Sequence, residues 1–161
     1  MVRPMMFALT LVTLAAAPAS AQAPAPDTYV AKAGDSDLYE RTSSQLGLQS
    51  TRDAKIRNFA TMMLRDHAKS TADVKRAAAA SRVAVPAPKL EPAQAQLIAE
   101  LRRATGTQRD RLYVTQQRTA HQQALALHGS YAQNGSAAPL KTVAAATAPV
   151  VQHHIEMLQG M

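Results

Sequence analysis

Apolar and small side chains recur at every third or fourth position through the middle of this chain. The clearest stripe consists of Ile56, Ala60, Met63, His67, Ser70, Val74 and Ala77. This spacing places side chains on one face of an α-helix, whereas a half-buried strand would alternate every second residue. No alternating run rich in β-branched residues occurs in the sequence. The sequence therefore predicts an all-α protein built from amphipathic helices.

The same periodicity, together with turn and cap residues, predicts where the helices lie. They are expected at 29–48, 51–82, 91–104, 108–132 and 139–158. Ser50 or Thr51 is expected to cap the second of them. The segment 91–104 is a short additional helix in the connection between the second and third long helices. Such a long connection is typical of a ferritin-like four-helix bundle, and a simple up-down-up-down bundle is the alternative.

Residues 1–21 have the order of a signal peptide. Arg3 precedes an uncharged apolar stretch, 5–17, and small residues lead to Ala21, after which we expect cleavage. A Pro/Ala linker, 22–27, follows, and the helical domain is expected to span 28–160. No later segment is apolar enough to be a transmembrane helix. We therefore expect an exported protein in the periplasm, either free or peripheral to the outer membrane.

The charge of the chain bears on its partners. The sequence has 18 basic and 11 acidic residues, a net charge of +7, and no cysteine. A basic exported protein can bind an anionic envelope surface, although charges spread along helix faces are better explained as a surface in contact with water. Four tyrosines and two phenylalanines offer few stacking surfaces for bases, so nucleic acid is not an expected partner.

Three of the five histidines lie on the apolar stripes of three different predicted helices. These are His67, His121 and His154. At a rise of about 1.5 Å per residue, each falls near the middle of its helix, so the three are expected at one level of the bundle. Imidazole binds Zn, Cu, Fe or Ni, and either Glu40 or Asp66 could add a carboxylate to such a metal site.

A structural role for these histidines is the alternative interpretation. Neighbours such as Tyr113 or Gln117 would then satisfy them by hydrogen bonds in the core. A ferritin-type di-iron centre is not predicted, because no Glu stands three residues before any His. The motifs Gly-x-Ser-x-Gly and His-Glu-x-x-His and the phosphate-binding loop are also absent, so no enzymatic reaction is predicted. Two hypotheses therefore stand: a bundle that binds a transition metal, and a binding module that holds a partner protein or a lipid.

Several motifs resemble those of a large family of exported bacterial proteins. The segment from Ile56 to His67 resembles V-k-x-F-A-x-x-M-x-x-D-H, the residues Tyr113, Gln117 and His121 resemble Y-x-x-x-Q-x-x-x-H, and Pro149 with His154 resembles L-P-x-x-x-x-H. That family is catalogued as a domain of unknown function, DUF4142, and its members are often labelled outer membrane proteins. The resemblance implies a ferritin-like fold and a shared functional cluster of His67, His121 and His154 with Glu40 on the first helix, but no reaction. We therefore expect a ferritin-like bundle of unassigned activity that binds a transition metal in envelope or metal stress.

Overall fold

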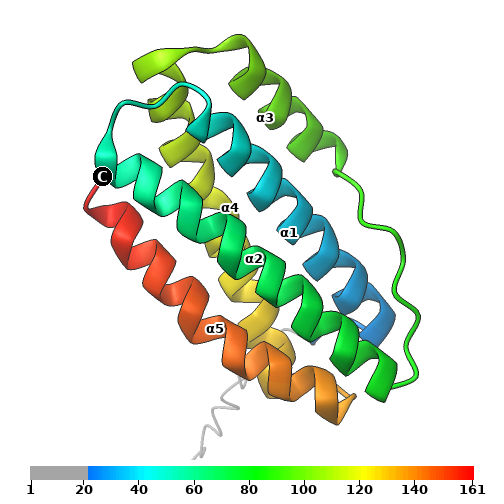
Figure 1. Cartoon of the computed structure of the whole chain (residues 1–161). Helices are drawn as coiled ribbons and strands as arrows, with labels where there is room; N and C mark the ends of the chain where they lie inside the picture. The colour runs from blue at the N-terminus through cyan, green and yellow to red at the C-terminus, as the bar shows by residue number, and fades with distance from the viewer. Residues whose placement is uncertain (1–21) are drawn as a thin grey trace, which may run out of the picture.

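The computed structural model describes residues 22–161, and the predicted signal peptide, 1–21, lies outside the described residues. The described part forms helices and no strand, which confirms the all-α class. The helices are α1 (Pro26–Leu48), α2 (Ala54–Ala80), α3 (Pro92–Arg103), α4 (Gly106–Asn134) and α5 (Ala138–Gln159) (Figure 1). None of these five combines the length and the apolar character needed to cross a bilayer.

The four long helices form a bundle in which α1 and α5 occupy opposite corners. α1 packs against α2 and α4, and α5 packs against the same two helices. The connection after α2 returns along the bundle through α3, so that α4 begins at the end where α2 also begins (Figure 1). α2 and α4 are therefore parallel and diagonal, whereas an up-down-up-down bundle would make them antiparallel neighbours. The bundle is ferritin-like, with α3 as the additional short helix.

The first two helices begin at positions that differ from the prediction. α1 begins at Pro26, inside the segment expected to be a linker, because a proline in the first turn lacks only an N–H that would have no helical partner there. α2 begins after Asp53, whose carboxylate accepts hydrogen bonds from two N–H groups of the first turn at 2.7 and 3.2 Å. Asp53, and not Ser50 or Thr51, is therefore the cap of α2. The hydroxyl of Thr51 instead accepts a hydrogen bond from the N–H of Asp53.

The core consists of two apolar clusters with a polar layer between them. One cluster includes Phe59, Met63, Tyr113 and Leu158, and the other includes Tyr29, Val74, Tyr131 and Leu140. Each long helix contributes to both clusters and carries a buried polar residue in or beside the stretch between them. These residues are Glu40 on α1, His67 on α2, His121 on α4 and His154 on α5. We call these four residues the polar layer.

The turn between α4 and α5 sets the level at which these two helices face each other. The turn predicted at Asn134-Gly135 is confirmed, since α4 ends at Asn134 and α5 begins at Ala138. A Cβ atom at Gly135 would lie 2.5 Å from a ring carbon of Tyr131. Glycine is therefore required here for steric reasons, and the tight turn brings the two histidines of this helix pair to one level.

Candidate metal centre

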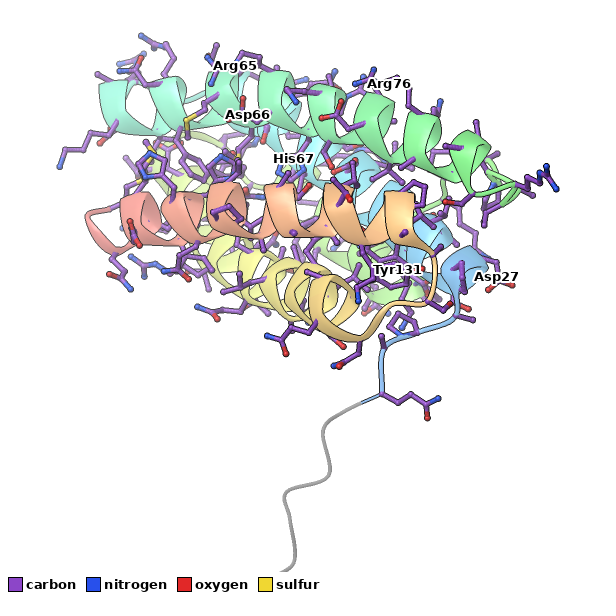
Figure 2. All side chains as sticks on the ribbon, turned by 90° about the horizontal axis from the view of Figure 1, so that it is seen from below. Asp27, Arg65, Asp66, His67, Arg76 and Tyr131 are labelled. Carbon is purple, nitrogen blue, oxygen red and sulfur yellow. The ribbon has the colours of Figure 1, made fainter. Side chains whose placement is uncertain are left out.

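Three histidine rings from three helices meet in the polar layer. His67, His121 and His154 are each at most 5% exposed, and their ring centroids are 5.3 to 6.1 Å apart. Figure 2 shows His67 on the side of α2 that faces α5. The prediction that the three histidines lie at one level of the bundle is confirmed. We call them the histidine trio.

Each ring of the trio has one nitrogen in a hydrogen bond and one without a partner. Nδ1 of His67 donates to a carboxylate oxygen of Asp37 at 2.8 Å. Nδ1 of His121 donates to the backbone carbonyl one turn earlier in α4 at 2.9 Å, and Nε2 of His154 donates to a carboxylate oxygen of Asp66 at 3.2 Å. The opposite nitrogens are buried and have no hydrogen-bond partner. Because an acceptor holds a proton on one nitrogen, the other nitrogen of each neutral ring offers a lone pair.

The ring nitrogens are close enough to become ligands of one ion. One nitrogen from each ring lies within 4.8 Å of those of the other two rings. In a tetrahedral zinc site with Zn–N bonds of about 2.1 Å, ligand nitrogens are about 3.4 Å apart. Each ring would therefore have to move inward by less than about 1 Å, which small changes in side-chain torsion can supply.

Glu40 of α1 lies beside the trio. It is fully buried, and neither carboxylate oxygen has a hydrogen-bond partner. One of these oxygens is 3.6 Å from Nδ1 of His121. Burial raises the pKa of Glu40 to about 7, against the opposing effect of positive charge on His67. The group of mutually close ligand atoms comes from the three histidines and includes no carboxylate oxygen. Glu40 therefore lies next to the candidate metal site in this structure and is not one of its ligands.

Two aspartates hold rings of the trio from outside. Asp66, a predicted ligand candidate, contacts the outer nitrogen of His154. Asp37, which sequence reasoning did not single out, binds His67, and its second oxygen accepts a hydrogen bond from a threonine of α2 at 2.8 Å. A carboxylate in this position fixes the ring and makes its free nitrogen more basic. The available signal was that Asp37 lies about one turn before Glu40 on the same face of α1.

Burial controls the protonation of the trio. It lowers the pKa of His121 to about 3, helped by positive charge on His67, and it lowers the pKa of His154 to about 4. Burial alone would also lower the pKa of His67, but the hydrogen bond with Asp37 and the charge of Glu40 outweigh burial and raise that pKa. His121 and His154 are therefore neutral at pH 7, the form in which imidazole binds a metal.

The neighbours expected for purely structural histidines do not satisfy the free nitrogens. Tyr113 shares a hydrogen bond with a serine of α1 at 2.8 Å, and the side-chain amide of Gln117 donates to another serine of α1 at 3.0 Å. Only the backbone of Gln117 contacts His121 through a hydrogen bond. Phe59 packs beside His121 and His154, with ring centroids 6.0 and 6.2 Å away. An apolar ring supplies no hydrogen bond, so the free nitrogens stay unpaired.

A fourth buried histidine, His128, borders a small cavity together with His67 and His154 but is not a member of the trio. His128 lies about two turns after His121 on α4, and its Nδ1 is 3.0 Å from the hydroxyl of Tyr29. Tyr29 stacks on Tyr131 with ring centroids 4.0 Å apart. Burial lowers the pKa of His128 to about 4. His128 is not part of the group of mutually close ligand atoms, and this makes it a useful comparison for the trio.

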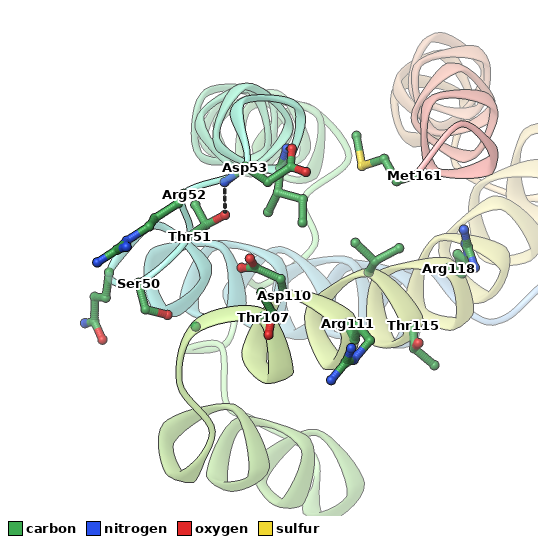
Figure 3. Close-up of a pocket in the computed structure, with 14 residues that line it drawn as sticks. Ser50, Thr51, Arg52, Asp53, Thr107, Asp110, Arg111, Thr115, Arg118 and Met161 are labelled. Carbon is green, nitrogen blue, oxygen red and sulfur yellow. Dashed lines mark hydrogen bonds between the residues drawn. The ribbon is translucent and has the colours of Figure 1, made fainter.

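A wide hollow of about 1160 Å³ lies at the end of the bundle where α2 and α4 begin (Figure 3). Residues of the loop between α1 and α2 and of the first turns of α4 line it, among them Asp53, Asp110 and Arg111. No member of the trio lines this hollow. The hollow and the histidines are therefore separate features of the bundle.

The donor set of the polar layer differs from that of a ferritin di-iron centre. Such a centre takes a Glu from each of two helices and a Glu-x-x-His pair from each of the other two. Among residues 22–161, Glu40 is the one buried glutamate, and Asp37 and Asp66 contact the outer nitrogens of histidines. The residues present therefore fit a single ion held by imidazoles and do not fit a carboxylate-bridged pair of iron ions.

Comparison with known families agrees with the motifs in the sequence. A family model described as a domain of unknown function, DUF4142, matches residues 12–161. No curated protein and no solved structure matched the chain. The match covers nearly the whole sequence and includes the four helices that carry the polar layer. This chain is therefore a member of the DUF4142 family.

Proposed function

We propose that this protein binds one divalent transition-metal ion inside its bundle through Nε2 of His67, Nε2 of His121 and Nδ1 of His154. The observation that supports the proposal is that these three nitrogens are buried without partners while the other nitrogen of each ring contacts an acceptor. Metal-binding histidines in proteins have this arrangement, because the outer acceptor fixes the tautomer and the orientation of the ring.

An ion would remove a destabilising feature of the metal-free core. Each buried polar atom without a partner costs about 1–3 kcal/mol of stability. The three nitrogens and both oxygens of Glu40 are in this state. An apolar layer of similar volume would avoid the cost, so stability alone does not explain three converging imidazoles. Coordination gives the three nitrogens the partner that they lack.

The donor chemistry restricts the class of metal. Neutral imidazoles bind Zn, Cu, Ni and Fe, whereas Ca and Mg prefer shells of oxygen atoms. The carboxylate of Glu40 lies 3.6 Å from a ring nitrogen of the trio, and those of Asp37 and Asp66 accept hydrogen bonds from its outer nitrogens. Their negative charge favours a divalent cation at the centre of the trio. We therefore place Zn, Cu, Ni and Fe, and not Ca or Mg, among the ions that this protein binds.

We also propose that the protein acts in the periplasm, in envelope or metal stress. The signal-peptide pattern of residues 1–21 supports export. N-terminal sequencing of protein recovered from the periplasm tests this point. The expected first residue is Gln22, and a periplasmic form that still begins at Met1 would refute cleavage.

Isothermal titration calorimetry of the purified protein with zinc sulfate at pH 7.5 tests the metal site. We expect one ion per chain and loss of binding in His121→Ala. The control is His153→Ala, because the side chain of His153 is 66% exposed and points about 100° away from that of His154. No heat of binding with Zn, Cu, Ni or Fe would refute the proposal, as would equal affinities of the two variants.

A further inference from the structure

A small cavity adjoins the histidine trio between α2 and α5. Its volume is about 20 Å³, and its lining includes Asp37, Asp66, His67, Ser70, His128 and His154. A space of about 10–15 Å³ measured in this way is enough for one water molecule. The cavity therefore matches one small molecule, of the size of water, in contact with two of the three histidines.

The lining offers hydrogen-bond partners to such a molecule. The hydroxyl of Ser70 is buried and has no partner in the protein. The carboxylates of Asp37 and Asp66 border the same space, and a buried water makes about three hydrogen bonds. Two carboxylates disfavour a small anion by Coulomb repulsion. A neutral hydroxylic molecule fits best, because it can donate to a carboxylate and share a hydrogen bond with Ser70.

The segment of α5 that lines this cavity also reaches the surface of the protein. Thr147 and Val150 line the cavity, and Val150 is 43% exposed although it is a large apolar residue. Pro149 lies inside α5 beside it. Proline has no N–H to donate to the carbonyl four residues earlier, so the hydrogen bonding of α5 is interrupted at this point. A solvent-exposed residue therefore borders the cavity next to the interruption in α5.

We infer that this cavity is a binding site for one water molecule, and that the Ser70 hydroxyl holds this molecule against the trio. The inference of a binding site in the cavity depends only on the geometry of the cavity and not on a bound metal ion. The further step, that the molecule exchanges with solvent next to a bound ion, rests on the proposed metal site. A trio with a solvent-accessible position of this kind resembles zinc sites that have three protein ligands and one open position more than it resembles closed structural sites.

Nuclear Overhauser effects between water and the protein test the cavity without any metal. In the purified protein treated with chelator, we expect an effect of long-lived water on the methyl groups of Val151, which is 2% exposed and lines the cavity. Ser70→Val fills the space and should abolish the effect, and Ser70→Ala, which removes only the hydroxyl, should weaken it. Ser50→Val is the matched control, because Ser50 also has a buried hydroxyl without a partner but lines the distant hollow. An absent effect in the unmodified protein, or an effect that persists in Ser70→Val, overturns the inference.

Relaxation of bulk water protons by the Cu²⁺-loaded protein tests access to the metal. We expect a clear enhancement of the relaxation rate in the unmodified protein and in Ser50→Val, and a several-fold smaller enhancement in Ser70→Val. Calorimetry should show that all three proteins bind one Cu²⁺ ion per chain. An unchanged enhancement in Ser70→Val overturns the exchange step. Absence of Cu²⁺ binding in every protein refutes the metal site instead, and the water measurement then decides the cavity site alone.

Discussion

The stabilisation by a metal ion against thermal unfolding should form a graded series across the unmodified protein and three variants. An ion that binds only the folded state stabilises it by RT ln(1 + [L]/Kd), which is about 2.7 kcal/mol when the free ion is at a hundredfold excess over Kd. For a domain of this size, that increment corresponds to a rise in Tm of about 10 °C. We expect this rise for the unmodified protein with Zn²⁺ at pH 7.5.

The amount of this metal-dependent stabilisation that each variant loses should depend on the position of the replaced residue relative to the ion. His121→Gln removes a ligand, and if Kd rises about a thousandfold the increment falls below about 0.1 kcal/mol. Asp37→Asn alters only the partner behind His67. A weakening of about 10- to 100-fold, as found for such partners, leaves an increment of about 0.4–1.4 kcal/mol. His128→Gln should keep the full increment, because His128 is buried on the same helix but outside the trio.

Calorimetric melting curves recorded with Zn²⁺ and with chelator measure this series. The increment is taken within each variant, so a loss of stability in the metal-free form cancels. His128→Gln is a matched control for His121→Gln, since both replace a buried histidine of α4 by the same residue. The reasoning is refuted if His121→Gln retains the increment, or if His128→Gln loses as much of it as His121→Gln does.

Three further predictions concern the bundle itself. Burial lowers the pKa of His128 to about 4, so the imidazole takes up a proton in the unfolded chain at a higher pH than in the folded protein. The free energy of unfolding should therefore fall by up to about 3 kcal/mol as the pH is lowered from 6.5 toward 4. Urea unfolding of metal-free protein at pH 7 and pH 4.5 should show that His128→Gln reduces this decline, and an equal decline in both proteins would contradict the assignment. Asp53→Ala removes the cap of α2 and should lower the free energy of unfolding by about 1 kcal/mol in urea titrations, whereas Asp27→Ala, which loses only contacts with the adjacent Thr28, should change it little. Gly135→Ala places a Cβ 2.5 Å from Tyr131 and should lower the free energy of unfolding by about 1–3 kcal/mol, and with it Tm. A Tm equal to that of the unmodified protein would show that the turn relaxes without cost.

The level of the histidine trio could be predicted from the sequence because helices have a fixed rise. Counting residues from the turns placed His67, His121 and His154 near mid-bundle, and the rings meet there. Helix length and turn position determine this level, and the periodicity and the Asn134-Gly135 turn define both well. The connectivity was harder to predict, because mid-helix positions coincide in both bundle types. The packing of α1 against α4 and of α5 against α2 distinguishes the two types.

The residues around the trio could not be assigned from spacing alone. Asp66 follows Arg65 and precedes His67 in the chain, so its side chain points about 100° away from that of His67, toward His154 on α5. Whether such a carboxylate binds an ion or a ring depends on distances between helices that periodicity does not contain. Asp37 and the cap Asp53 were missed for a related reason. Short polar side chains act through one or two specific hydrogen bonds, which leave no repeating pattern in the sequence.

The ferritin-like connectivity would make binding of the proposed ion a late event in folding. α1 and α2 form one hairpin and α4 and α5 the other, joined by the long connection through α3. Contacts within each hairpin are local and form early, whereas docking of the two hairpins requires closure of the longer connection. His121 and His154 belong to the second hairpin, and His67 belongs to the first. The complete set of three nitrogens therefore exists only after the halves have docked, so the ion should slow their separation more than it speeds their assembly.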